Sequence, residues 1–137
     1  MSFSPFVMFD GDCEAAFVFY QSVFGGNVRL LRYSDAPLLE QASAALSPKI
    51  MFAQLDLGGQ ELLGCDTSEN MYQPQQGMLV SWQGDTEEDV ERIFEALSEA
   101  GMVRKALDYT FWTPKYGLVE DKFGVIWMIS CRSHATL

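Results

Sequence analysis

An order of predicted elements that occurs twice constrains the fold of this chain most. Each half is predicted to run strand, helix, strand, strand, strand, and the polar segment 67–76 separates the two halves. In each half, apolar residues recur at three- and four-residue spacings, which predicts a helix with one buried face. These residues are Cys13, Ala16, Phe17, Tyr20, Val23 and Phe24 in the first half and Val90, Ile93, Phe94 and Leu97 in the second. The halves share little sequence, so the repeat rests on element order.

Both helices carry start and stop signals. Asp12 is the predicted N-cap of the first helix, and Gly25-Gly26 ends it. Asp85-Thr86 caps the second helix, and Gly101 ends it. The predicted strands cover residues 3–9, 28–33, 49–57 and 60–65, then 77–83, 103–109, 116–120 and 125–131. The stretch 34–48 is predicted to be a loop that could include a short helix.

The strand predicted over 49–57 alternates in a way that assigns its two faces. Met51, Ala53, Leu55 and Leu57 point to one face, which must pack on a helix, whereas Phe52, Gln54 and Asp56 point to the other. Gly58-Gly59 supplies the positive φ angles of a tight hairpin into the next strand. Phe52 and Gln54 are therefore expected to face away from the helix.

Composition limits the classes of partner. The apolar fraction of 48% is enough for a continuous core in a chain of 137 residues. The formal net charge of −10 disfavours nucleic acid and anionic membranes as partners, because phosphate binding needs clustered Lys and Arg. No basic segment followed by an apolar run opens the sequence, and no stretch approaches the ~20 apolar residues of a membrane span. We therefore expect a soluble, cytoplasmic protein.

Cysteine and histidine are too sparse for two common kinds of site. The three cysteines, Cys13, Cys65 and Cys131, are widely spaced, and His134 is the only histidine. This pattern favours buried, reduced thiols over a disulfide framework or a Cys/His zinc site. His134 lies three residues from the end, which disfavours a Cys/His nucleophilic pair.

Four blocks of the sequence together resemble a known family. They read FDGDCEAAFVFYQSVFGG (9–26), KIMFAQLDLGGQELLGCD (49–66), FEALSEAG (94–101) and FWTPKYGLVEDKFGVIWMISC (111–131). In this order and spacing they resemble the PhnB-like branch of the glyoxalase/bleomycin-resistance/dioxygenase, or vicinal oxygen chelate, superfamily. Proteins of this branch are often labelled 3-demethylubiquinone methyltransferase-like, yet the sequence has no Gly-rich nucleotide loop after a strand.

The resemblance implies an α+β fold of the glyoxalase type. Two βαβββ modules, about 1–66 and 77–132, would form curled mixed sheets around a cavity within one domain, 1–137. The resemblance also implies a homodimer. We therefore predict one glyoxalase-like domain per chain and two chains per molecule.

The resemblance also locates the superfamily's metal ligands, and here those positions are apolar. They fall at about Phe6, Phe52, Met78 and Met128. Neither a phenyl ring nor a thioether is a competent ligand for Mg²⁺, Mn²⁺ or Zn²⁺. We therefore expect no metal and no cofactor at this position.

The preferred hypothesis is the binding of an apolar or aromatic small molecule without a metal. The residues predicted to bind it are Phe6, Phe52, Gln54, Met78, Trp112, Tyr116 and Met128. One alternative is a metal-dependent lyase, isomerase or dioxygenase with atypical ligands such as Gln54, Asp56 and Glu120. Another is a structural or interaction role with a filled cavity, in which Trp112 and Tyr116 pack at a sheet or dimer interface.

Overall fold

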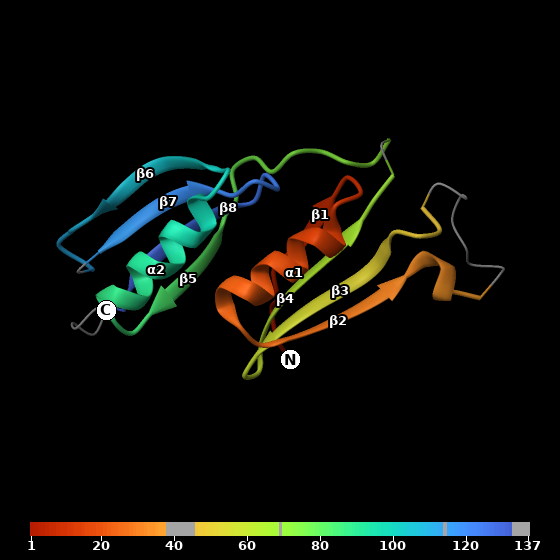
Figure 1. Ribbon diagram of the computed structural model, residues 1–137, viewed down its shortest axis with the longest axis horizontal. Helices are drawn as coiled ribbons and strands as arrows, with labels where there is room; N and C mark the ends of the chain where they lie inside the picture. Colours follow the sequence, from red (N-terminus) through yellow and green to blue (C-terminus); the bar gives the residue numbers. More distant parts are fainter. Residues whose placement is uncertain (38–45, 69, 114, 133–137) are drawn as a thin grey trace. The chain divides into compact units, whose positions relative to one another are not determined.

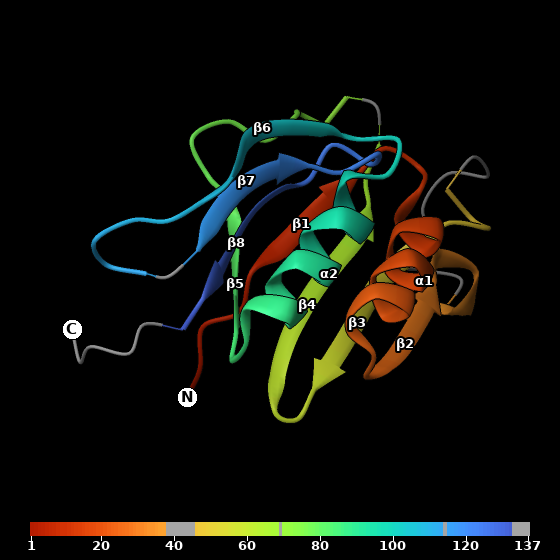
Figure 2. The ribbon, with the colours of Figure 1, turned by 60° about the vertical axis from the view of Figure 1, so that its left-hand side comes forward.

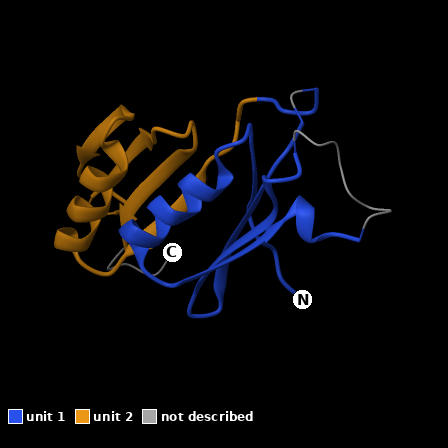
Figure 3. Cartoon of the chain, turned by 45° about the vertical axis from the view of Figure 1, so that its right-hand side comes forward, with its two compact units in different colours: residues 1–73 blue, residues 74–137 orange. Residues whose placement is uncertain are grey.

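The computed structural model describes residues 1–37, 46–68, 70–113 and 115–132. The chain forms two compact units, Met1–Gln73 and Pro74–Leu137 (Figure 3). The boundary between them falls inside the segment 67–76, where the sequence predicts the break. That residues 1–137 form a single domain stays a prediction.

The first unit is a four-stranded mixed sheet with one long helix (Figure 1). Its elements are β1 (Phe6–Phe9), α1 (Cys13–Phe24), β2 (Asn27–Arg32), the short 3₁₀ helix η1 (Tyr33–Asp35), β3 (Ile50–Leu57) and β4 (Gln60–Asp66). The strand order is β1-β4-β3-β2, in which β1 runs parallel to β4 and the other neighbours are antiparallel. Two edge strands, β1 and β2, leave this sheet open.

The second unit repeats this topology. Its elements are β5 (Val80–Gly84), α2 (Glu87–Ser98), β6 (Met102–Asp108), β7 (Tyr116–Glu120) and β8 (Ile126–Cys131). The strand order is β5-β8-β7-β6, again with a parallel first pair, and this sheet is open as well. The prediction of an α+β fold with two βαβββ modules is confirmed.

In the first unit, α1 covers one face of the sheet and runs along β3 and β2 (Figure 2). The helix buries the predicted stripe, including Phe17 and Tyr20, on the side of sheet residues such as Leu55, except that Phe24 at its end is half-buried. Helix and sheet approach so closely that a Cβ on Gly64 would lie 2.7 Å from the Phe17 ring. Only glycine fits at this point of β4 without displacing the helix.

In the second unit, α2 packs on β7 and β8. Its predicted stripe is buried as expected, and the Oγ1 of Thr86 accepts a hydrogen bond from the amide of Asp89, which confirms the predicted cap. A Cβ on Gly117 would lie 2.8 Å from the Phe94 ring, so a glycine again permits the close contact. The helix ends at Ser98, and Ala100 adopts the left-handed conformation (φ 57°) just before Gly101.

Some predicted boundaries are corrected by the structure. The first strand begins at Phe6 instead of residue 3, and the fifth begins at Val80 instead of residue 77. Part of the predicted loop 34–48, and also His134, lie outside the described residues. Within the described ranges, none of the helices has the length and apolar character that crossing a membrane requires.

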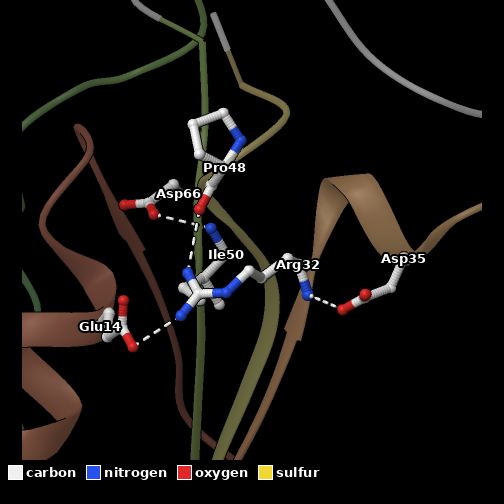
Figure 4. Close-up of polar contacts among 6 residues, drawn as sticks. All are labelled: Glu14, Arg32, Asp35, Pro48, Ile50 and Asp66. Atoms are coloured by element: carbon white, nitrogen blue, oxygen red, sulfur yellow. Dashed lines mark hydrogen bonds and ion pairs between the residues drawn. The ribbon is translucent and has the colours of Figure 1, made fainter. Parts of the chain in front are cut away.

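The carboxylate of Asp66, which is fully buried at the end of β4, holds the first unit together. Its Oδ1 accepts hydrogen bonds of 2.9 Å from the amides of Gly11 and Cys13. Its Oδ2 accepts one of 2.9 Å from the amide of Ile50, which Figure 4 shows. The side chain thereby joins the β1–α1 connection and the start of β3 to the end of β4. Asp12 occupies the N-cap position, as predicted, but Asp66 accepts the hydrogen bond from the first helical amide.

Arg32, at the end of β2, connects this strand to α1 and to the residues before β3 (Figure 4). Its guanidinium donates to the carbonyl of Pro48 (2.9 Å) and to the carboxylate of Glu14 on α1 (2.8 Å). Its amide donates to the carboxylate of Asp35 (2.9 Å). These contacts fix the end of β2 against α1 and against the residues that lead into β3.

Replacing Asp66 by asparagine is expected to destabilise the protein strongly. The asparagine side chain keeps one acceptor oxygen, but its NH₂ group replaces the other, so two hydrogen-bond donors would face each other in the core. The free energy of unfolding should therefore fall by roughly 2–4 kcal/mol. Urea denaturation followed by circular dichroism measures this loss. The matched control is Asp56→Asn, which also removes a carboxylate that accepts a backbone N–H, from Gly59, but at a half-buried position. Equal losses for the two variants would contradict this account of Asp66.

Candidate functional site

The sheet face that α1 does not cover carries large apolar side chains in the first unit. Phe6 and Met8 on β1, Leu31 on β2 and Phe52 on β3 are 38–52% exposed. Strand register places them on one face, because Leu31 pairs with Phe52 while the neighbouring pair of Leu30 and Ala53 faces the helix. The Phe6 and Phe52 rings are 6.4 Å apart between centroids. We call this surface the open face of the first unit.

The open face of the first unit changes from apolar to polar along its strands. Met8 pairs with Cys65, and Phe52 pairs with Leu31, at the apolar end. Gln54 lies two residues further along β3, and its Nε2 donates to the Oε2 of Glu61 (2.7 Å). This bond fixes the Gln54 side chain, so its carbonyl oxygen is available to accept a hydrogen bond from a ligand.

The second unit has a corresponding open face on the side of its sheet away from α2. Tyr116 and Leu118 on β7 lie there, opposite Ser130 and Met128 on β8. Their neighbours in sequence, such as Val119 and Ile129, are buried on the α2 side.

An aromatic pair and a cation stand at one end of this face. Trp112, from the β6–β7 connection, places its ring 5.0 Å from that of Tyr116. The ammonium of Lys105 on β6 lies 4.2 Å from the centroid of the Tyr116 ring, a cation–π contact.

The connection that holds Trp112 is fixed by two threonines. The Oγ1 of Thr110 accepts hydrogen bonds from the amides of Trp112 (3.2 Å) and Thr113 (3.1 Å). The hydroxyl of the buried Thr113 donates to the carbonyl of Cys131 at the end of β8 (2.5 Å). Trp112 is therefore held beside Tyr116 by the local backbone.

The predicted site residues form two groups, one on each unit. Phe6, Phe52 and Gln54 share the open face of the first unit, and Tyr116 and Met128 share that of the second, with Trp112 against Tyr116. Met78, predicted to head the fifth strand, lies before β5 and is 75% exposed, so this strand assignment is wrong.

Sequence reasoning missed several residues of these faces. Strand alternation would have found Met8 and Leu31 beside Phe6 and Phe52, and Ser130 beside Met128. Lys105 could not be placed in this way, because the pairing of β6 with β7 is irregular on both sides of it. Asp121, in the turn between β7 and β8, is buried, and its carboxylate accepts a hydrogen bond from the Trp127 indole (2.9 Å).

The side chains named as alternative metal ligands already form hydrogen bonds or ion pairs within their own units. Gln54 is bonded to Glu61, Asp56 accepts a hydrogen bond from the amide of Gly59 (3.0 Å), and Glu120 forms an ion pair with Arg104. Across the described residues, no group of three or more His, Cys, Asp or Glu side chains is arranged to hold a metal ion.

The three thiols are poor nucleophiles. Burial, followed by the nearby Asp66 carboxylate, raises the pKa of Cys13 far above its ordinary value. Burial is also the main cause that raises the pKa values of Cys65 and Cys131. Each thiol is therefore protonated at neutral pH, and its thiolate is the form that would react.

Comparisons with known proteins agree with this architecture. A family model described as 3-demethylubiquinone-9 3-methyltransferase matches residues 1–130. Protein YjdN of Escherichia coli is 28% identical over 139 residues, which cover 95% of each chain. The crystal structure of protein PA1353 from Pseudomonas aeruginosa superposes with a TM-score of 0.88 at 34% identity, over 96% of this chain and 98% of that one.

Two further structures share the fold. A putative 3-demethylubiquinone-9 3-methyltransferase, PhnB protein, from Bacillus cereus has a TM-score of 0.75 at 23% identity, over 96% of this chain and 99% of that one. A glyoxalase/bleomycin resistance protein/dioxygenase family enzyme from Burkholderia phytofirmans has a TM-score of 0.64 at 18% identity, over 93% of this chain and 95% of that one. The chain therefore belongs to the family described as 3-demethylubiquinone-9 3-methyltransferase, and its fold is shared with glyoxalase-like structures.

Proposed function

We propose that the protein binds a small, mainly apolar or aromatic molecule on its open sheet faces, without a metal of the superfamily type. One observation carries the proposal: Phe6, Met8, Leu31 and Phe52 stand exposed together on a single sheet face. Scattered exposed apolar residues are ordinary, but a contiguous apolar patch is typical of a binding surface.

The chemistry of the faces favours a ligand with an apolar body and few polar groups. Phe6 and Phe52 in the first unit, and Trp112 and Tyr116 in the second, offer ring faces and edges for dispersion and stacking contacts. Such surfaces return little of the hydration energy that a multiply charged ligand loses on binding. Gln54 lies beside the apolar end of its face and would orient one polar group of the ligand.

The family description names a methyl transfer, which the chain does not support. A nucleotide-based methyl donor is usually held by a Gly-rich loop between a strand and a helix. Here the β1–α1 connection is Asp10-Gly11-Asp12, and the β5–α2 connection is Asp85-Thr86. The proposal therefore rests on the open faces and not on that description.

We also propose that two chains associate as a homodimer. Each sheet ends in edge strands, and β6 is exposed at most of its positions. Edge strands that stay uncovered risk uncontrolled pairing with other chains, and a symmetric dimer is the commonest way to cover them.

Shortening the central aromatic side chains should weaken ligand binding. A screen of apolar, aromatic and polar metabolites by thermal shift identifies ligands of the wild type, and titration then gives dissociation constants. Phe52→Ala or Trp112→Ala should raise the dissociation constant about tenfold or more, because a buried aromatic contact contributes roughly 1.5–3 kcal/mol.

Val18→Ala is the matched control for this experiment, since Val18 is an exposed apolar residue on α1. It should leave binding unchanged. Ligands that bind both aromatic variants as tightly as the wild type would refute the proposal, as would hits confined to anionic sugars or phosphates.

Divalent metals should not stabilise the protein. The positions that correspond to the superfamily's ligands carry Phe6, Phe52, Met78 and Met128, which offer no imidazole or carboxylate. Specific binding to the native state would raise the melting temperature. Titration with Zn²⁺, Ni²⁺, Mn²⁺ and Fe²⁺, with a chelator-treated sample as control, should leave the melting temperature unchanged. Close to one metal ion per chain after purification without an affinity tag would contradict this expectation.

Light scattering coupled to size exclusion tests the dimer. At micromolar concentration the mass should be twice the chain mass of 15.4 kDa. A single species of 15.4 kDa over this range would rule the dimer out.

A further inference from the structure

The second unit contains a buried hydroxyl that is not satisfied. Ser130 on β8 is completely buried, and its Oγ has no hydrogen-bond partner among the described residues. Burying a hydroxyl without a partner costs free energy, so nearly all buried polar groups in proteins are paired. An unpaired hydroxyl on a sheet face with an aromatic pair calls for an explanation.

Strand register shows where this hydroxyl lies. Ile129 and Cys131 on β8 are buried on the side of α2, so Ser130 between them belongs to the open face of the second unit. Its direct neighbours on the adjacent strands are Tyr116 on β7 and Gln83 on β5. Because opposed residues of a sheet bring their side chains together, the Ser130 hydroxyl lies beside the base of the Tyr116 side chain.

Lys105 adds a positive charge beside Tyr116 on the same face. Its ammonium lies 4.2 Å from the centroid of the Tyr116 ring and donates a 3.3 Å hydrogen bond to the carbonyl of Ala106. Five other cations of this acidic chain pair with carboxylates, namely Arg32, Arg92, Arg104, Lys115 and Arg132. In the described ranges, Lys105, like Arg29 and Lys49, forms no ion pair of this kind.

We propose that the open face of the second unit holds a subsite for the carboxylate of an aromatic or apolar monocarboxylic acid, in which the Ser130 hydroxyl donates a hydrogen bond to the carboxylate and the Lys105 ammonium neutralises its charge. This inference rests on the proposed small-molecule binding and specifies the class of ligand. The Trp112 and Tyr116 rings contact the apolar body of the acid.

Three features select this class of ligand. The hydroxyl and the ammonium are both donors, so they match an acceptor with a negative charge better than a neutral or cationic group. One ammonium balances one carboxylate, whereas a phosphate with nearly two charges would remain uncompensated in an acidic protein. The surrounding side chains of Leu118 and Met128 are apolar and suit a hydrocarbon body. Because Ser130 is buried, binding at its hydroxyl requires a neighbouring side chain, such as that of Tyr116 or Gln83, to move aside.

The experiment compares acids with their own amides. Phenylacetate, indole-3-acetate and octanoate, each beside its primary amide, are titrated at neutral pH into the full chain and its variants by calorimetry and thermal shift. The variants are Ser130→Ala and Lys105→Met, which keep the shape of the face. Ser98→Ala on α2 and Lys122→Met in the β7–β8 turn are the matched controls.

The expected result has three parts. The wild type binds at least one acid about tenfold or more tightly than its amide, since a hydrogen bond to a charged group is worth roughly tenfold to a hundredfold in affinity. Ser130→Ala and Lys105→Met each remove most of this preference and leave amide binding unchanged, whereas the control variants keep it. Without ligand, Ser130→Ala melts at or above the wild-type temperature, because an unpaired buried hydroxyl has been removed.

The opposite results are equally distinct. Amides that bind as tightly as acids, or acids that bind both variants as tightly as the wild type, overturn the subsite and leave the proposed function intact. A clear fall in the melting temperature of ligand-free Ser130→Ala also overturns it, since the hydroxyl would then have a structural partner. If neither acids nor amides bind at all, the subsite is overturned and the proposed binding of apolar molecules fails with it for these probes.

Discussion

The three backbone hydrogen bonds accepted by the Asp66 carboxylate are the constraint on which the first unit depends. Hydrogen bonds between sheet strands fix β4 beside β1 and β3, but they do not determine where the chain enters α1 or where β3 begins. Asp66 fixes both points from the end of one strand, and Tyr33 adds a hydrogen bond from its hydroxyl to the Asp66 carbonyl (2.7 Å). With its N-terminus held there, α1 lies across one sheet face only, and the other face remains open.

The second unit reaches the same topology with different polar contacts. At the end of β8, where the first unit has Asp66, the chain has Cys131, whose carbonyl accepts a hydrogen bond from Thr113. A buried carboxylate of this unit, that of Asp121, lies in the turn that leads into β8. It accepts hydrogen bonds from the amides of Phe123 and Val125 and from the Trp127 indole. The repeat is thus a repeat of layers and strand order, and the buried carboxylates of the two units have different hydrogen-bond partners.

This difference explains which parts of the structure the sequence could predict. Helix α1 was predicted to its residue boundaries, because the apolar period and the flanking glycines are local signals. The face assignment of Phe52 and Gln54 followed from alternation along β3 in the same way. The role of Asp66 could not be predicted, because its partners Gly11 and Cys13 lie more than 50 positions away in the sequence. Lys105 was missed for a related reason, since irregular pairing interrupts the alternation that would have assigned its face.

The open faces show how one architecture can carry different surfaces on the same core. A βαβββ unit has a single helix, so it can bury only one face of its sheet, and the side chains on the other face are free to differ between relatives with little cost to the core. In this chain Phe6 and Phe52 share the open face of the first unit, and their ring centroids lie 6.4 Å apart. Apolar side chains at such positions offer dispersion and stacking contacts but no ligands for a cation. The side chains on each open face therefore determine which class of molecule that face can bind.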